Sequence, residues 1–234
     1  MYDDLTAADI LSMLRAEGSV ERASRSDWYF PTKMAVLGIS NPEVKRLMRE
    51  IYKSLRDRPR EAILLLCREL VASHVMEGQM LAWLLLEKAK IVGTLEKEEM
   101  EGIPGILDNW ASVDAYGVMI YGILWRLGKI SDRDVAALQE SEDVWQRRLA
   151  LVATVALNLS SRGGTGDASR TLAVCKRAVN DHHDMIVKAL SWSLRSLVRW
   201  DRKAVEQFLG EQRNSLHKRV LREVSHKLEH GTKN

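Results

Sequence analysis

The chain has 234 residues, 46% of them hydrophobic, with 35 Lys and Arg against 32 Asp and Glu, a formal net charge of +3. This length suffices to bury a core, and only Cys67 and Cys175 occur, which excludes a disulfide framework and favours buried thiols in a reducing compartment. The acidic N-terminus does not read as a signal peptide, and no apolar run approaches the roughly 20 residues that cross a bilayer, so we expect a cytoplasmic protein without a membrane partner.

Apolar residues recur at helical spacing along the chain, as at Leu47, Ile51 and Leu55, and the alternating runs typical of strands are absent. Asn41 followed by Pro42 reads as an N-cap and a first-turn proline. The sequence therefore predicts an all-α protein. The expected helices, in chain order, span residues 6–17, 20–29, 42–56, 59–74, 77–92, 95–101, 103–127 (open to a break near Trp110), 131–139, 143–160, 168–180, 184–199, 202–212 and 215–229.

The breaks between these helices are short and recur about every 15 to 20 residues, which favours antiparallel helix pairs stacked side by side. We expect a HEAT-like helical-repeat solenoid, an α-α superhelix that forms a single domain over residues 1–234 with a concave basic groove, although no exact repeat is visible. The glycine-rich segment 160–167 (SSRGGTGD) is expected to be a loop or hinge. It lacks the Gly-Lys-Ser/Thr of a nucleotide-binding loop.

Charge is distributed unevenly along the chain. Residues 144–234 hold 17 Lys and Arg against 8 Asp and Glu, whereas the remainder holds 18 against 24. A basic half suits a phosphate backbone, but charged side chains also solvate ordinary helix surfaces. The charge pattern alone leaves both interpretations open.

The segment 109–114 (NWASVD) opens an apolar helix and places Trp110 and Asp114 four residues apart, on one helix face. An aromatic ring beside a carboxylate can stabilise a cation. The structural alternatives are that Asn109 or Ser112 caps the helix, that Asp114 complements the helix dipole, and that Trp110 belongs to the core.

Basic residues recur on two later helices. In VWQRRL, two arginines are adjacent, so their side chains point about 100° apart, and one can reach a phosphate while the other pairs with an acid. In KALSWSLR, Lys188, Trp192 and Arg195 recur at steps of three and four residues and form a basic stripe around an aromatic ring. Both patterns are also compatible with solvated surfaces, with Trp192 in the core and the bases extending past it.

In this order, WASVD, VWQRRLAL and KALSWSLR resemble segments of the DNA alkylation-repair glycosylases of the AlkD family, which are built from HEAT-like repeats. The similarity includes residues 38–42 (GISNP) and 216–219 (LHKR), so it covers most of the chain. The family's catalytic aspartate falls on Asp114, its cleft tryptophans on Trp110 and Trp192, and its DNA-contacting arginine on Arg148. The chain departs from the family at 183–185 (HDM), where the family has bulky aromatics, and this departure bears on the contacts around the lesion.

The resemblance implies a monofunctional hydrolase that removes purines alkylated at N3 or N7 from duplex DNA. We expect it to be a monomer, because a solenoid groove must admit duplex DNA, and to act in the bacterial cytoplasm without cofactor or metal. Because the alkylated base is cationic, it is already a good leaving group and needs no general acid. A carboxylate, Asp114, would stabilise the oxocarbenium-like sugar and orient a water. Trp110 and Trp192 would pack against the sugar and exclude solvent, and the lesion would stay in or near the duplex rather than flip into a pocket.

The expected phosphate contacts predict salt-sensitive binding with little sequence preference. These residues are Arg148, Lys188, Arg195, Lys218 and Arg219.

Two alternatives stay open: a catalytically silent helical-repeat protein that binds damaged or branched DNA, and a protein-interaction scaffold without a DNA role. His226 and His230 lack an evident third ligand and are set aside as a metal site. The remaining tryptophans are expected in core or interhelical packing; they are Trp28, Trp83, Trp125 and Trp200.

Overall fold

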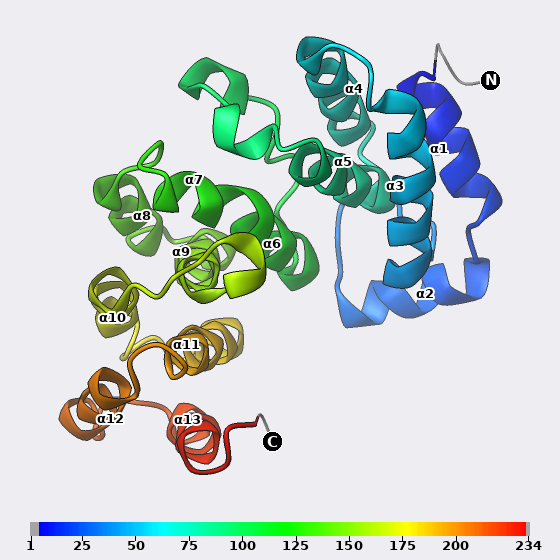
Figure 1. The fold of residues 1–234 in the computed structure, drawn as a ribbon. Helices are drawn as coiled ribbons and strands as arrows, with labels where there is room; N and C mark the ends of the chain where they lie inside the picture. Colours follow the sequence, from blue (N-terminus) through cyan, green and yellow to red (C-terminus); the bar gives the residue numbers. More distant parts are fainter. Residues whose placement is uncertain (1–4, 233–234) are drawn as a thin grey trace. The chain divides into compact units, whose positions relative to one another are not determined.

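A computed structural model describes residues 5–232 of the protein, without the side chains of residues 27 and 28, so the prediction for Trp28 lies outside the described residues. Every regular element in the described part of the chain is a helix, apart from one isolated bridge between Ala35 and Val75 (Figure 1). The all-α prediction is confirmed.

The chain divides into two compact units, Met1–Tyr116 and Gly117–Asn234, called unit 1 and unit 2. A single domain over 1–234 and a concave basic groove stay predictions. Unit 1 contains α1 (Ala7–Ala16), α2 (Val20–Tyr29), α3 (Asn41–Leu55), α4 (Arg60–Ala72), α5 (Met76–Lys88), the short 3-10 turns Val92–Thr94 and Lys97–Met100, and α6 (Trp110–Tyr116). Unit 2 contains a π-helical segment (Gly117–Tyr121), α7 (Gly122–Arg126), α8 (Asp132–Gln139), α9 (Val144–Asn158), the 3-10 turn Ser160–Arg162, α10 (Ala168–Arg177), α11 (Asp184–Leu197), α12 (Arg202–Glu211) and α13 (Lys218–His230).

Most predicted helices are present, and most of the differences lie at their ends. α3 begins one residue early because Ser40, not Asn41, is its N-cap: Ser40 and Glu43 form a reciprocal capping box. The stretch predicted as helix over 103–127 begins only at Trp110, and Gly105, with a positive φ of 64°, turns the chain within the non-helical segment before it. The stretch predicted over 95–101 is reduced to the 3-10 turn Lys97–Met100.

Unit 1 is built around α5, which packs against α1, α3, α4 and α6. Its Trp83 is fully buried, as predicted, and the indole nitrogen donates a 2.9 Å hydrogen bond to the carbonyl of Ile103. α5 also buries a carboxylate: Glu77 accepts hydrogen bonds from the backbone N–H groups of Leu37, Gly38 and Ile39 at 2.8–3.1 Å. This carboxylate fixes the turn that leads into α3.

Gly38 makes that turn possible. Its φ is +75°, and a Cβ there would lie 2.3 Å from the carbonyl oxygen of Ser19 and 2.5 Å from the nitrogen of Ala23. A side chain at this position would therefore collide with backbone as well as adopt a disfavoured conformation. The GISNP segment thus has a structural role in holding α2 close to the start of α3.

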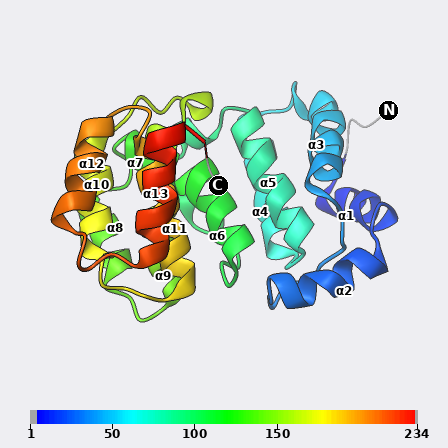
Figure 2. The same ribbon diagram turned by 90° about the horizontal axis from the view of Figure 1, so that it is seen from below.

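Unit 2 consists of two layers of helices. Figures 1 and 2 show α7, α9, α11 and α13 side by side in one layer, with α8, α10 and α12 in the other. α9 is the centre of this unit, and its residues from Arg148 to Asn158 are all buried. Successive antiparallel helices packed in two layers are the arrangement predicted for a helical-repeat protein.

The glycine-rich segment 160–167 is a loop that other residues hold in place. Arg126 donates hydrogen bonds to the carbonyls of Gly163 at 2.8 Å and Arg162 at 2.9 Å. Trp200, predicted in core or interhelical packing, is not a core residue, because it is 38% exposed; its indole donates to the carbonyl of Asn158 at 2.7 Å and its ring lies against Gly166. Trp125, by contrast, is buried as predicted.

Each unit contains one free, buried thiol, Cys67 in α4 and Cys175 in α10. The prediction of buried, unpaired cysteines is confirmed. Burial raises the pKa of Cys67 to about 12 and raises that of Cys175 well above its usual range, because the thiolate is poorly solvated in an apolar interior. Across residues 5–232, none of the helices has the length and apolarity to span a bilayer.

Candidate functional site

α6 begins where the sequence expects a cap, and Asn109 is that cap. This buried residue accepts a 3.0 Å hydrogen bond from the backbone N–H of Ser112, and its amide donates to the Ser112 hydroxyl at 3.1 Å. Ser112 is therefore not the cap. Asp114 lies beyond the first turn of the helix, where the effect of the helix dipole on a carboxylate is small, so neither capping nor dipole compensation explains it.

The residues before α6 are fixed by hydrogen bonds to other parts of unit 1. Asp108 accepts hydrogen bonds from the Thr32 hydroxyl and the Lys33 backbone N–H, both at 2.7 Å. Although partial burial raises the pKa of Asp108, these hydrogen bonds outweigh it and hold the pKa below its usual value. The Gln79 amide pairs with Ile106, accepting from its N–H and donating to its carbonyl, both at 2.9 Å.

Replacing Gln79 with leucine should loosen the start of α6, because the N–H and carbonyl of Ile106 lose their partners. We expect a loss of about 1–3 kcal/mol in the free energy of unfolding and faster amide exchange at Ile106. Hydrogen exchange read by NMR or mass spectrometry measures this. Gln139 in unit 2 provides the control, since its replacement by leucine should leave exchange at Ile106 unchanged.

Trp110 belongs to a cluster of three aromatic rings. Its ring meets Tyr29 edge-on at a centroid distance of 5.2 Å and Phe30 at 6.2 Å, and its indole nitrogen donates a 3.2 Å hydrogen bond to the carbonyl of Tyr29. An open, largely apolar depression of about 480 Å³ adjoins this cluster and is lined by Arg25, Ser26, Tyr29 and Phe30. Trp110 is partly exposed, so it is not a core residue.

Asp114 is partly exposed and lies one turn after Trp110 on the same face of α6. The structure thus brings together two of the predicted catalytic residues and adds Tyr29 and Phe30, which the sequence did not indicate. These two rings precede Pro31 at the end of α2, and no local spacing links them to a residue 80 positions later. Only the tertiary fold reveals the contact.

Arg148 lies on α9 in unit 2 and is buried, with 4% of its surface exposed. Its guanidinium donates a hydrogen bond to the carbonyl of Met185, and so ties α9 to the first turn of α11. The adjacent Arg147 pairs with Asp181 at 2.8 Å and donates to the carbonyls of Ser141 and Glu142. A direct phosphate contact by Arg148 stays a prediction.

Three other predicted phosphate contacts are linked by two carboxylates between α11 and α13. Asp184 pairs with Lys188 at 2.6 Å and with Arg219 at 3.5 Å. Glu223, which is buried, accepts hydrogen bonds from Arg219 at 2.7 Å and the Ser191 hydroxyl at 2.6 Å, and lies 3.8 Å from Arg195. These contacts were not visible in the sequence.

The electrostatics of this network follow from burial and pairing. Burial alone would raise the pKa of Glu223, but the hydrogen bonds from Ser191 and Arg219 and the two guanidinium charges lower it below its usual value. The hydrogen bond and charge of Lys188 lower the pKa of Asp184. Both carboxylates are therefore ionised at neutral pH.

Two predicted residues of unit 2 lie outside these pairs. Trp192 is partly exposed on α11, between Lys188 and Arg195 in the sequence of that helix, and Lys218 is exposed at the first residue of α13. Trp110 and Asp114 belong to unit 1, whereas the predicted cations and Trp192 belong to unit 2. Their joint action stays a prediction.

A metal centre has no visible basis in the described residues: no three His, Cys, Asp or Glu side chains among residues 5–232 are grouped as ligands. His226 and His230 place their rings 4.3 Å apart on α13.

Comparison with known proteins identifies the chain. The family model described as DNA alkylation repair enzyme matches residues 10–228. A solved structure described as a predicted DNA alkylation repair enzyme from Enterococcus faecalis is similar in fold, with a TM-score of 0.69 and 22% identity over 89% of this chain and 95% of that one. A search of curated proteins gives no significant match. The match over nearly the whole chain supports a role in the repair of alkylation damage and confirms the family resemblance seen in the sequence: this protein belongs to the DNA alkylation repair enzyme family.

Proposed function

We propose that the protein is a monofunctional DNA glycosylase that removes purines alkylated at N3 or N7 from duplex DNA. The observation that carries this proposal is the pair of Trp110 and Asp114 on one face of α6, with the tryptophan ring held by Tyr29. A partly exposed carboxylate one helical turn from a fixed and partly exposed aromatic ring suits the stabilisation of a cationic sugar.

The reaction needs little from the protein beyond this electrostatic help. The C1′–N bond breaks, its electron pair goes to the cationic purine, and the base leaves in neutral form. Asp114 stabilises the positive charge that develops on the sugar and orients a water, which forms the new C1′–O bond and loses its proton. The products are a free base, an abasic site and a proton. Trp110 and Trp192 pack against the sugar and exclude bulk water.

DNA binding is assigned to unit 2, where basic residues exceed acidic ones. Residues 117–234 hold 20 Lys and Arg against 13 Asp and Glu, whereas residues 1–116 hold 15 against 19. Lys188, Arg195, Lys218 and Arg219 contact phosphates, and Arg148 acts on the backbone directly or by positioning α11 through Met185. The protein works as a monomer in the cytoplasm, without cofactor or metal.

The test is release of N7-methylguanine from a methylated duplex by the purified protein, followed by chromatography of the free base. We expect release under single-turnover conditions, with strand breakage only after alkali treatment, as for a monofunctional enzyme. Binding without release would favour the catalytically silent DNA-binding protein. A mobility shift that fails even at low salt would favour the protein-interaction scaffold.

A further inference from the structure

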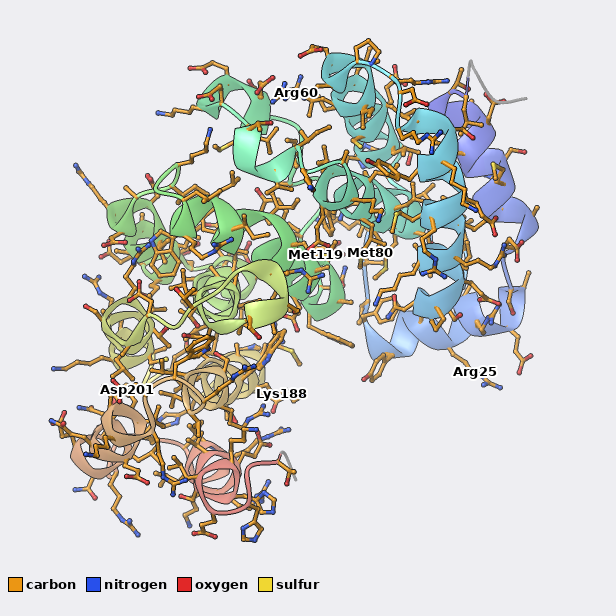
Figure 3. All side chains as sticks on the ribbon, in the orientation of Figure 1. Arg25, Arg60, Met80, Met119, Lys188 and Asp201 are labelled. Atoms are coloured by element: carbon orange, nitrogen blue, oxygen red, sulfur yellow. The ribbon has the colours of Figure 1, made fainter. Side chains whose placement is uncertain are left out.

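The carboxylate of Asp184 is bound between two cations that come from different helices. One oxygen lies 2.6 Å from the Lys188 ammonium on α11, and the other lies 3.5 Å from the Arg219 guanidinium on α13. Figure 3 labels Lys188 on α11, the helix next to α13. An anion therefore already occupies the space that these two cations share.

A carboxylate and a phosphodiester offer similar acceptors to such a pair. Lysine binds a phosphate oxygen as a point charge, and a guanidinium presents several N–H groups to the same anion. The side chains of Asp184, Lys188 and Arg219 are 58%, 38% and 35% exposed. The site is open to solvent, so the Asp184 side chain has room to rotate away.

Arg219 is held in place without Asp184. Its Nε donates a 2.7 Å hydrogen bond to Glu223, whose side chain is only 9% exposed, while a terminal nitrogen is the atom nearest Asp184. The buried Glu223 thus fixes the Arg219 guanidinium through Nε, and the exposed Asp184 contacts its terminal nitrogen. Only Asp184 therefore competes with a phosphate for Arg219, whereas Glu223 orients the guanidinium that would bind it.

We propose that Lys188 and Arg219 form a binding site for one backbone phosphate of DNA, and that Asp184 occupies this site as an internal competitor until DNA displaces it. The inference rests on the proposed DNA-binding function and deepens it. Asp184 lowers the affinity for DNA as a whole. It therefore limits how long the protein stays on undamaged sequence.

The experiment compares Asp184→Asn with the unmodified protein on an undamaged duplex over a range of salt concentrations. We expect binding about 5- to 10-fold tighter at low salt and a gain that shrinks as the salt concentration rises, because salt screens the exposed ion pairs through which Asp184 competes with the phosphate. Asp184→Ser gives a second variant with a different side chain. Circular dichroism shows whether each variant is folded.

Removing any acid from a DNA-binding protein raises affinity somewhat, so a matched control is needed. Glu206→Gln removes the same charge from an ion pair of similar exposure, 2.8 Å from Arg202 on α12. It should change the affinity less than 2-fold, since Glu206 pairs with Arg202 and not with Lys188 or Arg219. Equal gains for Asp184→Asn and Glu206→Gln would overturn the proposal.

A double-mutant cycle tests the mechanism itself. In a Lys188→Gln, Arg219→Gln background, Asp184→Asn should give no gain, because no cation pair is left to release. A gain of the same size in that background would contradict the proposal. If neither the unmodified protein nor Asp184→Asn binds DNA, both the inference and the proposed function fall. If the unmodified protein binds and Asp184→Asn adds nothing beyond Glu206→Gln, only the inference falls.

Discussion

Asp114→Asn should lower the single-turnover rate of N7-methylguanine release by about 100-fold or more. The substitution preserves the size of the side chain and removes the negative charge that the proposed mechanism places against the cationic sugar. Removing one preorganised electrostatic group of this kind commonly reduces a rate by about 10²–10³. The measurement is release of base from a duplex with one lesion, with protein in excess.

The control for this variant is Asp57→Asn, which changes the same chemical group in unit 1 at a side chain that is 87% exposed and paired with its neighbour Arg56. It should release base at the rate of the unmodified protein. Asp114→Asn should also bind undamaged DNA at least as tightly as the unmodified protein, because it removes a negative charge. Full activity in a folded Asp114→Asn variant would show that another group carries the chemistry.

Glu77→Ala should destabilise the protein strongly. The Glu77 side chain is buried and satisfies the N–H groups of Leu37, Gly38 and Ile39, so its loss leaves one buried and two partly buried donors unpaired and removes the packing of the side chain. Leaving a buried donor without its acceptor costs about 1–3 kcal/mol, so the loss of the acceptor of three donors should cost about 3 kcal/mol or more. Urea unfolding followed by circular dichroism measures the change in the free energy of unfolding.

Glu69→Ala gives the comparison for this variant, because Glu69 is exposed on α4 in the same unit. Its free energy of unfolding should change by no more than about 0.5 kcal/mol. Amide exchange adds a local measurement: Glu77→Ala should speed exchange at Leu37, Gly38 and Ile39. Unchanged unfolding and unchanged exchange would mean that this turn does not depend on the carboxylate.

Local patterns predicted the helices well, because apolar periodicity and capping residues act over a few positions. The prediction of α3 was wrong by one residue only, since Ser40 and Asn41 are both good caps and the reciprocal bond from Glu43 selects Ser40. The stretch before Trp110 was predicted as helix because its apolar spacing fits one. The pairing of Ile106 with Gln79, which no local pattern contains, holds it in a non-helical conformation instead.

In the candidate site, too, the local features could be predicted from the sequence and the tertiary contacts could not. The spacing of Trp110 and Asp114 on one helix face is a local property, and the family resemblance added their expected role. The contact of Trp110 with Tyr29 depends on how α2 and α6 pack, and the carboxylates that hold Lys188 and Arg219 depend on the packing of α11 against α13. A sequence stripe of bases does not show which of them are already paired with acids.

The two buried cysteines allow the units to be followed separately. A thiol reacts with a labelling reagent as the thiolate, and Cys67 and Cys175 are both protonated and enclosed in the folded protein. Labelling therefore proceeds only when the surrounding helices open, so its rate reports local opening. Because α4 belongs to unit 1 and α10 to unit 2, one time course, resolved by peptide mass, gives the opening equilibrium of each half in the intact chain.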